Sequence, residues 1–371
     1  MKILLNIIRF IVGVLFIFSG LVKANDPLGL SYKMEEFFAA WNWNWAFQFS
    51  LIISVAMIAF EIIAGVALLL GWKQKLFSWL LLLLTIFFTF LTGYAVLSGK
   101  FKSCGCFGDC LPLTAKQSFI KDVILSVLVI FLFVNRKKIL PILSAKMLSV
   151  LMIITVLLSV FGQLYILYHL PFKDCLPYAV GNDLNKQMQP GPHFQPAQIQ
   201  VNMIYKHNGK QITFDTEHMP ADLNDSTYEY VGRNDVVLKE AVDEPKIEDF
   251  SLRTLDGGDS TKSILNLHNY VLFFIRNFDG KKPDWEDSFH KIRNACFSKV
   301  LILVTSNGQQ VDDYFNPHLK PASMVTVCDA TVMKTFLRSK VGIVLMDKAT
   351  VIGKYNINDV DKAIDAINNM H

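Results

Sequence analysis

The strongest chemical signal in the sequence is a short run of cysteines and glycines, Cys104-Gly105-Cys106-Phe107-Gly108-Asp109-Cys110. Its glycines allow tight turns, including backbone conformations with positive φ. A disulfide between Cys104 and Cys106 would close a very small ring, and strained, exposed disulfides are the ones that exchange. The spacing therefore predicts a redox pair, Cys104 and Cys106, that passes electrons between a partner protein and a lipid-soluble carrier.

Cys110 and Cys175 are the expected resolving or structural partners of that pair. A purely structural bond that ties this loop to Cys175 stays open as an alternative, because extracytoplasmic cysteines commonly end as structural disulfides. Four thiols can also hold zinc, although the spacing Cys-x-Cys-x3-Cys is not a standard finger pattern. The last two cysteines, Cys296 and Cys328, are expected to be buried free thiols.

The elements around this loop are hydrophobic helices. The chain has 371 residues, of which 52% are hydrophobic and 18% charged, with a mean hydropathy of +0.35. Soluble domains carry about 25% charged residues, and a helix needs about 20 apolar residues to cross a bilayer. Five segments approach that length: Ile3–Val22, Phe47–Gly71, Leu76–Ser98, Phe119–Val134 and Leu143–Leu167. A net charge of +4, spread along the chain, does not indicate a nucleic-acid partner.

Basic residues set the expected orientation. Lys2, Arg9, Lys73, Lys75 and the run Arg136–Lys138 fall on one side of the five segments, which favours a cytoplasmic N-terminus. Everything after about Tyr168, and all six cysteines, would then face the oxidising compartment. A cleaved signal peptide ending near Lys23 is the alternative for the first segment, whose apolar stretch of about 20 residues is long for that role.

Glu61 is the second candidate, because it lies inside the second hydrophobic segment. An ionisable group there costs a few kcal/mol and marks a functional site by default. We expect either a proton site or a quinone pocket, so quinone is a candidate cofactor and no cofactor is established by the sequence; no metal site is expected. The alternative is a protonated carboxyl group that bonds a neighbouring helix. Lys23 is either its partner or a side chain that extends to the membrane surface.

Residues 171–245 are expected to form a linker and a small β-rich region. Asn208-Gly209 between the runs Ile199–Tyr205 and Gln211–Asp215 is a strong hairpin signal. A second pair of short strands is expected at Tyr228–Val231 and Val236–Lys239.

From residue 246 to residue 371, strands and helices alternate and end in a strand pair and a helix, which predicts a thioredoxin-like layer. The Cys-x-x-Cys expected after the first core strand is absent, and Arg276 begins the segment in its place. Lys340-Val341-Gly342 stands where a cis-proline is expected. The overall fold class is thus a membrane helix bundle followed by an extracytoplasmic α/β domain retained for binding or shape.

Several segments resemble the DoxX-like membrane proteins: Phe18–Lys23, Asp26–Gly29, Tyr32–Phe38, Glu61–Gly65 and Leu68–Gly71. The cysteine loop is similar to the branch of that group that includes MauE, the membrane protein of methylamine utilisation. The resemblance covers residues 1–135, and the addition of a fifth helix (136–170) and a soluble tail resembles DoxX proteins of Bacteroidetes-type bacteria. It implies a four-helix membrane core and a role in thiol or sulfur redox.

The leading hypothesis is a bacterial inner-membrane protein with a thiol–disulfide role in the envelope, either an oxidoreductase or its membrane electron-transfer partner. Its partners would be the lipid bilayer and an envelope client or oxidoreductase, which the thioredoxin-like domain would dock. The alternative is a non-catalytic membrane scaffold or assembly factor. A third hypothesis is a transport function. Glu61 is the one feature that supports it, because the sequence shows no broken-helix or inverted-repeat pattern.

Overall fold

The computed structural model describes the chain apart from residues 1, 100, 102–104, 106, 216–217, 221–222, 224–226, 240, 316, 318–322 and 371. Cys104 and Cys106 therefore lie outside the described residues. The chain divides into two compact units, one made of Met1–Leu184 with Asp249–His371 and the other of Asn185–Glu248.

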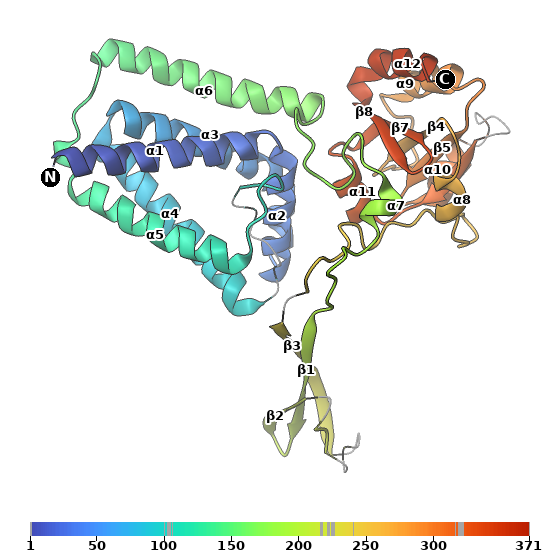
Figure 1. Ribbon diagram of the computed structural model, residues 1–371, viewed down its shortest axis with the longest axis horizontal. Helices are drawn as coiled ribbons and strands as arrows, with labels where there is room; N and C mark the ends of the chain where they lie inside the picture. Colours follow the sequence, from blue (N-terminus) through green and yellow to red (C-terminus); the bar gives the residue numbers. More distant parts are fainter. Residues whose placement is uncertain are drawn as a thin grey trace. The chain divides into compact units, whose positions relative to one another are not determined.

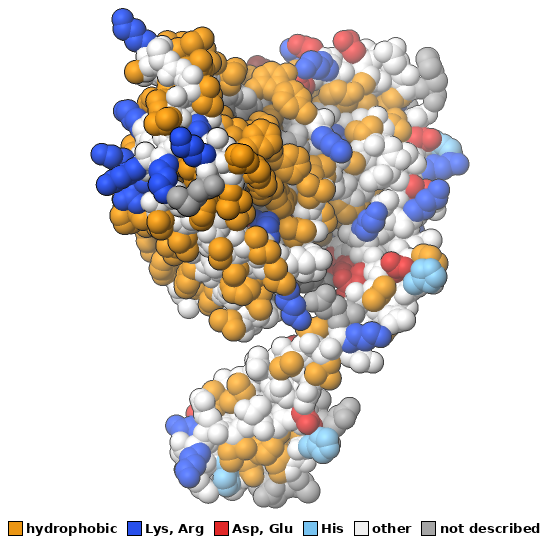
Figure 2. All heavy atoms as spheres, turned by 60° about the vertical axis from the view of Figure 1, so that its left-hand side comes forward, with side chains coloured by type: hydrophobic (Ala, Val, Ile, Leu, Met, Phe, Trp, Pro, Cys, Tyr) orange, Lys and Arg blue, Asp and Glu red, His pale blue; other side chains and the backbone are white. Residues whose placement is uncertain are grey.

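The first part of the chain is a helical membrane bundle, as predicted (Figure 1). Among the residues that the structure describes, five long helices are each apolar and long enough to cross a bilayer. Large hydrophobic side chains are exposed along them, and Figure 2 shows this apolar surface over the bundle. The helices are α1 (Lys2–Ala24), α3 (Ser50–Leu70, extended by a 3₁₀ turn at Asn44–Phe49), α4 (Gln74–Ser98), α5 (Ala115–Val134) and α6 (Ala145–Tyr168).

Helices α1 and α3 pack at close range through small residues. A Cβ atom on Gly65 would lie 2.8 Å from the carbonyl oxygen of Gly13, so only glycine fits there. At the same pair, the Arg9 guanidinium donates to the carbonyl oxygens of Leu68 and Leu69, each at 2.8 Å. These carbonyls lie in the last turn of α3, where the regular helical hydrogen bonds end, and Leu68 accepts one further bond, from the Gly71 amide at 3.3 Å. Arg9 therefore has a structural role.

A further helix, α2 (Pro27–Ala40), follows α1 and was not predicted. Asp26 caps it by accepting a hydrogen bond from the Gly29 amide at 2.9 Å, and Pro27 occupies its first turn. Cys110 and Cys175 form a disulfide with their Cα atoms 4.9 Å apart. This bond places the loop before α5 and the segment after α6 at the same end of the bundle.

The unit Asn185–Glu248 contains a three-stranded antiparallel sheet in the order β2-β1-β3. The predicted hairpin is present between β1 (Gln198–His207) and β2 (Lys210–Asp215), with Asn208 and Gly209 at positive φ. The expected second strand pair is wrong, because β3 is one strand, Tyr228–Lys239. Strand β1 is long enough to pair with the intervening Gly232–Asp235 segment as well as with both predicted strands.

The C-terminal domain has the predicted thioredoxin fold. Its five-stranded sheet has the order β6-β5-β4-β7-β8, in which β4, β5 and β6 are parallel and β7 and β8 are antiparallel to their neighbours. The strands are β4 (Tyr270–Ile275), β5 (Leu301–Thr305), β6 (Met324–Val327), β7 (Val341–Asp347) and β8 (Thr350–Asn356). The helices are α8 (Thr261–Leu265), α9 (Glu286–Ala295), α10 (Gly308–Phe315), α11 (Ala330–Phe336) and α12 (Val360–Asn368), and a short helix, α7 (Leu184–Gln187), precedes the three-stranded sheet.

Every residue of β4 and β5 is buried, so these continuous apolar runs form the centre of the domain. Cys296 and Cys328 are buried, as expected, and neither forms a disulfide with another described residue. Burial raises the pKa of Cys328 to about 12, so it stays a neutral thiol and a poor nucleophile at physiological pH. These two cysteines therefore do not supply the missing Cys-x-x-Cys.

Candidate functional site

A cavity of about 550 Å³ opens among α1, α3, α4 and α5. Most of its wall is apolar and comes from side chains such as Leu15, Phe16, Phe88, Ile124, Leu125 and Leu128. Its polar lining is confined to a few groups, namely Ser19, Lys23, Glu61, Thr85, Gln117, Lys121 and Asp122. An apolar pocket with a few convergent polar groups is the usual form of a small-molecule site.

Glu61 and Lys23 form an ion pair in the wall of this cavity. The two residues are 1% and 2% exposed, and Ser19 also donates to the Glu61 carboxylate, at 3.1 Å. Lys23 is thus the partner of Glu61 and does not extend to the membrane surface. Removing one member of a buried pair leaves the other charge uncompensated, which costs about 3–5 kcal/mol.

Asp122 is a second buried carboxylate in the same wall, and sequence reasoning missed it. It is 3% exposed, pairs with Lys121 at 2.7 Å, and accepts a hydrogen bond from Thr92 of α4 at 3.2 Å. The available signal was an aspartate near the start of the predicted span Phe119–Val134. An acidic residue inside a membrane span is a functional candidate, as Glu61 is, because burying its charge is costly.

The cysteine loop reaches this cavity through Phe107. The Phe107 ring lies 5.9 Å from the ring of Phe18, and the Lys121 ammonium is 4.9 Å from its centre. Phe107 directly follows Cys106 in the chain, so the loop that carries the predicted redox pair also supplies part of the cavity wall. The Cys104–Cys106 pair itself falls outside the described residues and stays a prediction.

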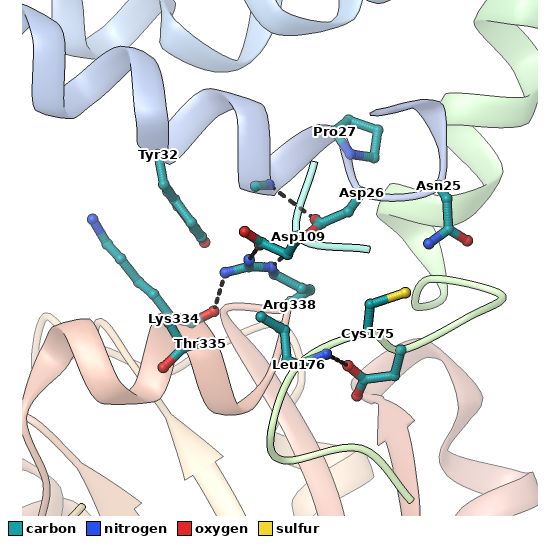
Figure 3. A network of polar contacts seen from close by, with 12 residues as sticks. Asn25, Asp26, Pro27, Tyr32, Asp109, Cys175, Leu176, Lys334, Thr335 and Arg338 are labelled. Atoms are coloured by element: carbon teal, nitrogen blue, oxygen red, sulfur yellow. Dashed lines mark hydrogen bonds and ion pairs between the residues drawn. The ribbon is translucent and has the colours of Figure 1, made fainter. Parts of the chain in front are cut away.

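At the end of the bundle that carries the disulfide, Arg338 binds two carboxylates of the membrane domain (Figure 3). Its guanidinium contacts Asp26 at 2.7 Å and Asp109, a residue of the cysteine loop, at 2.6 Å. Burial raises the pKa of Asp26 above its usual range despite the nearby Arg338. For Arg338 itself, burial lowers the pKa, but the two carboxylates outweigh that effect and raise it overall.

Tyr32 of α2 lies at the centre of the same junction. The cationic groups of Arg276, Lys334 and Arg338 lie 5.5, 4.8 and 5.3 Å from its ring centre. Arg276 also donates to the Tyr32 hydroxyl at 2.5 Å, and Lys334 pairs with Glu35 at 3.0 Å. Three cations of the C-terminal domain thus meet an aromatic ring and three acids of the membrane domain.

The chain brings together Cys110 with Cys175 and Glu61 with Lys23, whereas Cys296 and Cys328 form no disulfide with each other in the C-terminal domain. Within the described parts of the chain, no group of three or more His, Cys, Asp or Glu residues is placed to hold a metal ion. Since Cys110 and Cys175 are bonded to each other, they are not available as a pair of zinc thiolates.

Comparison with protein families gives two matches. The family described as methylamine utilisation protein MauE matches residues 1–135, and a domain of unknown function (DUF8463) matches residues 199–240. No curated protein sequence matches the chain. The chain is therefore a membrane protein whose N-terminal bundle resembles MauE; the resemblance to DoxX stays an expectation.

Two solved structures are similar to part of the chain. The crystal structure of yeast Sco1 shares 15% identity, covers 32% of this chain and 91% of its own, and gives a TM-score of 0.24. The structure of BsSco, described as a member of the Sco family of cytochrome c oxidase assembly proteins with a disulfide switch, shares 11% identity. It covers 34% of this chain and 94% of its own, with a TM-score of 0.26.

Proposed function

We propose that this protein couples thiol–disulfide exchange in the bacterial envelope to a membrane quinone. The observation that carries the proposal is the apolar cavity with Glu61, Lys23 and Asp122 in its wall, because the cysteine loop contributes Phe107 to that same wall. A lipophilic carrier and an exchanging thiol pair would then meet within one short segment. Cys104 and Cys106 are the proposed redox pair, with Cys110 and Cys175 as a structural bond that holds the loop.

The chemistry balances with the groups that line the cavity. Oxidation of a dithiol to a disulfide releases two electrons and two protons, and conversion of a quinone to a quinol takes up both. Lys23 and Ser19 are hydrogen-bond donors suited to a quinone carbonyl oxygen, and Glu61 and Asp122 are carboxylates able to relay protons. The apolar remainder of the wall suits the ring and its isoprenoid tail.

The proposed location is the bacterial inner membrane, with the N-terminus in the cytoplasm and the C-terminal domain in the periplasm. The charge bias of the connecting segments supports this orientation. A disulfide between Cys110 and Cys175 also suits an oxidising compartment on their side of the membrane.

The test is anaerobic quinol formation by the purified full chain, with dithiothreitol as dithiol and a short-chain ubiquinone as acceptor. We expect one quinol per dithiol oxidised, and a rate that falls to background in Cys106→Ser. Cys296→Ser is the matched control, because it removes a buried thiol of the C-terminal domain. Equal rates in the wild type and Cys106→Ser would contradict the proposal.

The second candidate is a non-catalytic membrane scaffold or assembly factor. The observation that favours it is the lack of a Cys-x-x-Cys in a domain of thioredoxin fold, since that domain cannot exchange disulfides by itself. Retention of partner binding by a Cys104→Ser/Cys106→Ser variant that forms no quinol would favour this function.

A further inference from the structure

The C-terminal domain turns one particular face toward the membrane domain. Arg276 directly follows the first core strand β4, at the place where a Cys-x-x-Cys begins in an active thioredoxin fold. Its backbone amide donates to the carbonyl oxygen of Lys340 at 2.9 Å, so the turn before β7 lies beside it. The face that contacts α2 and the cysteine loop therefore corresponds to a thioredoxin active-site face.

The two sides of this contact are complementary in charge. Arg276, Lys334 and Arg338 stand on the thioredoxin-like side, and Asp26, Glu35 and Asp109 stand around Tyr32 on the membrane side. Asp109 belongs to the cysteine loop, and Asp26 caps helix α2. The C-terminal domain therefore contacts both of these segments of the membrane domain. Figure 3 shows Arg338 between them.

The contacts on this surface include ion pairs and cation–π contacts, and three apolar clusters each lie within a single domain. The cluster around Phe273 draws only on the C-terminal domain, and those around Leu68 and Phe37 draw only on the helices of the membrane domain. The Lys334 and Glu35 side chains remain 34% and 28% exposed, so this pair is weak and is screened by salt. The Arg338 side chain is only 6% exposed, so a protein that displaces the domain has to supply a cation of its own to Asp26 and Asp109.

We propose that the surface made by Asp26, Tyr32, Glu35 and Asp109 is a docking site for the active-site face of a thioredoxin-fold dithiol protein with basic residues around its Cys-x-x-Cys. The chain's own thioredoxin-like domain occupies that site as an inactive mimic. The proposal deepens the proposed function, because it names the class of protein whose dithiol reaches the loop. The partner's two thiols become a disulfide, and the electrons and protons pass to the quinone.

Opening need not detach the domain from the chain. Lys354 pairs with Asp174 at 2.5 Å and His169 pairs with Asp359 at 2.8 Å, so the segment after α6 holds the domain independently of Tyr32. A partner can therefore compete for the Tyr32 surface while the domain stays tethered nearby.

The experiment uses the full chain in lipid nanodiscs with reduced thioredoxin as the probe. The oxidation rate of thioredoxin is divided by that of dithiothreitol, a dithiol too small to need the docking surface. Lys334→Glu places two acids opposite each other and weakens the mimic, so we expect this ratio to rise about tenfold. Adding Glu35→Lys restores an opposite-charge pair and should return the ratio toward the wild-type value.

Lys291→Glu is the control, because it reverses an exposed charge of the same domain that pairs with Asp361 instead of the membrane domain. It should leave the ratio unchanged. A ratio that stays constant or falls in Lys334→Glu overturns the inference, whereas failure to oxidise either dithiol contradicts the proposed function instead.

A second readout needs no turnover. A water-soluble carbodiimide should join Lys334 to Glu35, a pair that lies 3.0 Å apart, and mass spectrometry measures the yield. Excess reduced thioredoxin, or a thioredoxin with added lysines around its active site, should lower that yield at least about twofold by competition. An undiminished cross-link under both probes overturns the inference.

Discussion

Lys23 and Glu61 place two formal charges inside a helical bundle where each depends on the other. We expect Glu61→Gln to destabilise the protein by about 3–5 kcal/mol, because it leaves the Lys23 ammonium buried and unpaired. Lys23→Met should cost a similar amount for the opposite reason. The measurement is thermal unfolding in detergent.

The double variant Lys23→Met/Glu61→Leu is the informative companion to these single changes. It removes both charges together, so its stability should approach that of the wild type. Quinol formation should nevertheless be lost, because both polar groups are missing from the cavity wall. Additive losses in the double variant would mean that the two side chains act independently, against the pairing observed here.

At the scale of residues, the sequence placed Glu61 inside an apolar span, and the side chain is buried at 1% exposed. Its role as a proton or quinone site stays a prediction, argued from the cost of a carboxylate in such a span. Its pairing with Lys23 spans 38 positions of the chain and two helices, so it depends on helix packing. Asp122 lay close to the end of a predicted span, where a charge looks ordinary.

At the scale of elements, α2 depends on Asp26 in two separable ways, as a helix cap and as a partner of Arg338. Asp26→Asn keeps a capping side chain and loses the charge, whereas Asp26→Ala loses both. Because burial raises the pKa of Asp26, the folded protein holds a proton on this carboxyl group more tightly than the unfolded chain does. Asp26→Asn keeps a capping oxygen, so Asp26→Ala should cost about 1 kcal/mol more than Asp26→Asn.

The raised pKa of Asp26 also predicts how the stability of the fold changes with pH. A carboxyl group with a raised folded-state pKa adds stability at low pH, and this contribution is lost as the pH rises through that pKa. As the pH rises above about 4, the ordinary pKa of an aspartic acid, and through the raised folded-state pKa, the wild type should therefore lose some stability that Asp26→Asn does not lose. Thermal unfolding of the wild type and of Asp26→Asn across this pH range measures the difference in stability. Identical pH profiles for the two proteins would contradict a raised pKa of Asp26.

Helix α2 and strand β3 show why elements are harder to predict than spans. The cap residues Asp26 and Pro27 were visible, but a helix that lies outside the membrane lacks the long apolar run that marks a crossing. Strand β3 continues through Gly232–Asp235 because β1 offers a backbone partner there. Whether the turn-like segment Gly232–Asp235 becomes part of a strand depends on the presence of β1 beside it. The four residues themselves do not contain that information.

At the scale of the whole molecule, the proposed topology has each of the five long apolar helices of the described residues cross the membrane once, which puts Lys2 and Met370 on opposite sides. Alkaline phosphatase, which is active only outside the cytoplasm, should be active when fused after His371. The same enzyme fused after Lys138, between α5 and α6, should be inactive. Activity after Lys138 would invert the proposed orientation.

The five spans and the thioredoxin fold were predictable because hydropathy and strand–helix alternation are local properties of the chain. The cavity and the Tyr32 junction were not, since both assemble side chains from distant segments. Arg338 and Asp26, for example, are 312 positions apart. Their meeting depends on which face the C-terminal domain presents, and no periodicity encodes that choice.

The bond between Cys110 and Cys175, separated by 65 positions, also constrains how the protein is made. It closes a covalent ring that contains both α5 and α6, so the ring threads the bilayer twice. In the proposed orientation, the ring can close only after Cys175 has been synthesised and moved across the membrane. Maturation of the membrane domain would then end with an oxidation outside the cytoplasm, and cells that lack an envelope oxidant should accumulate the open, linear chain.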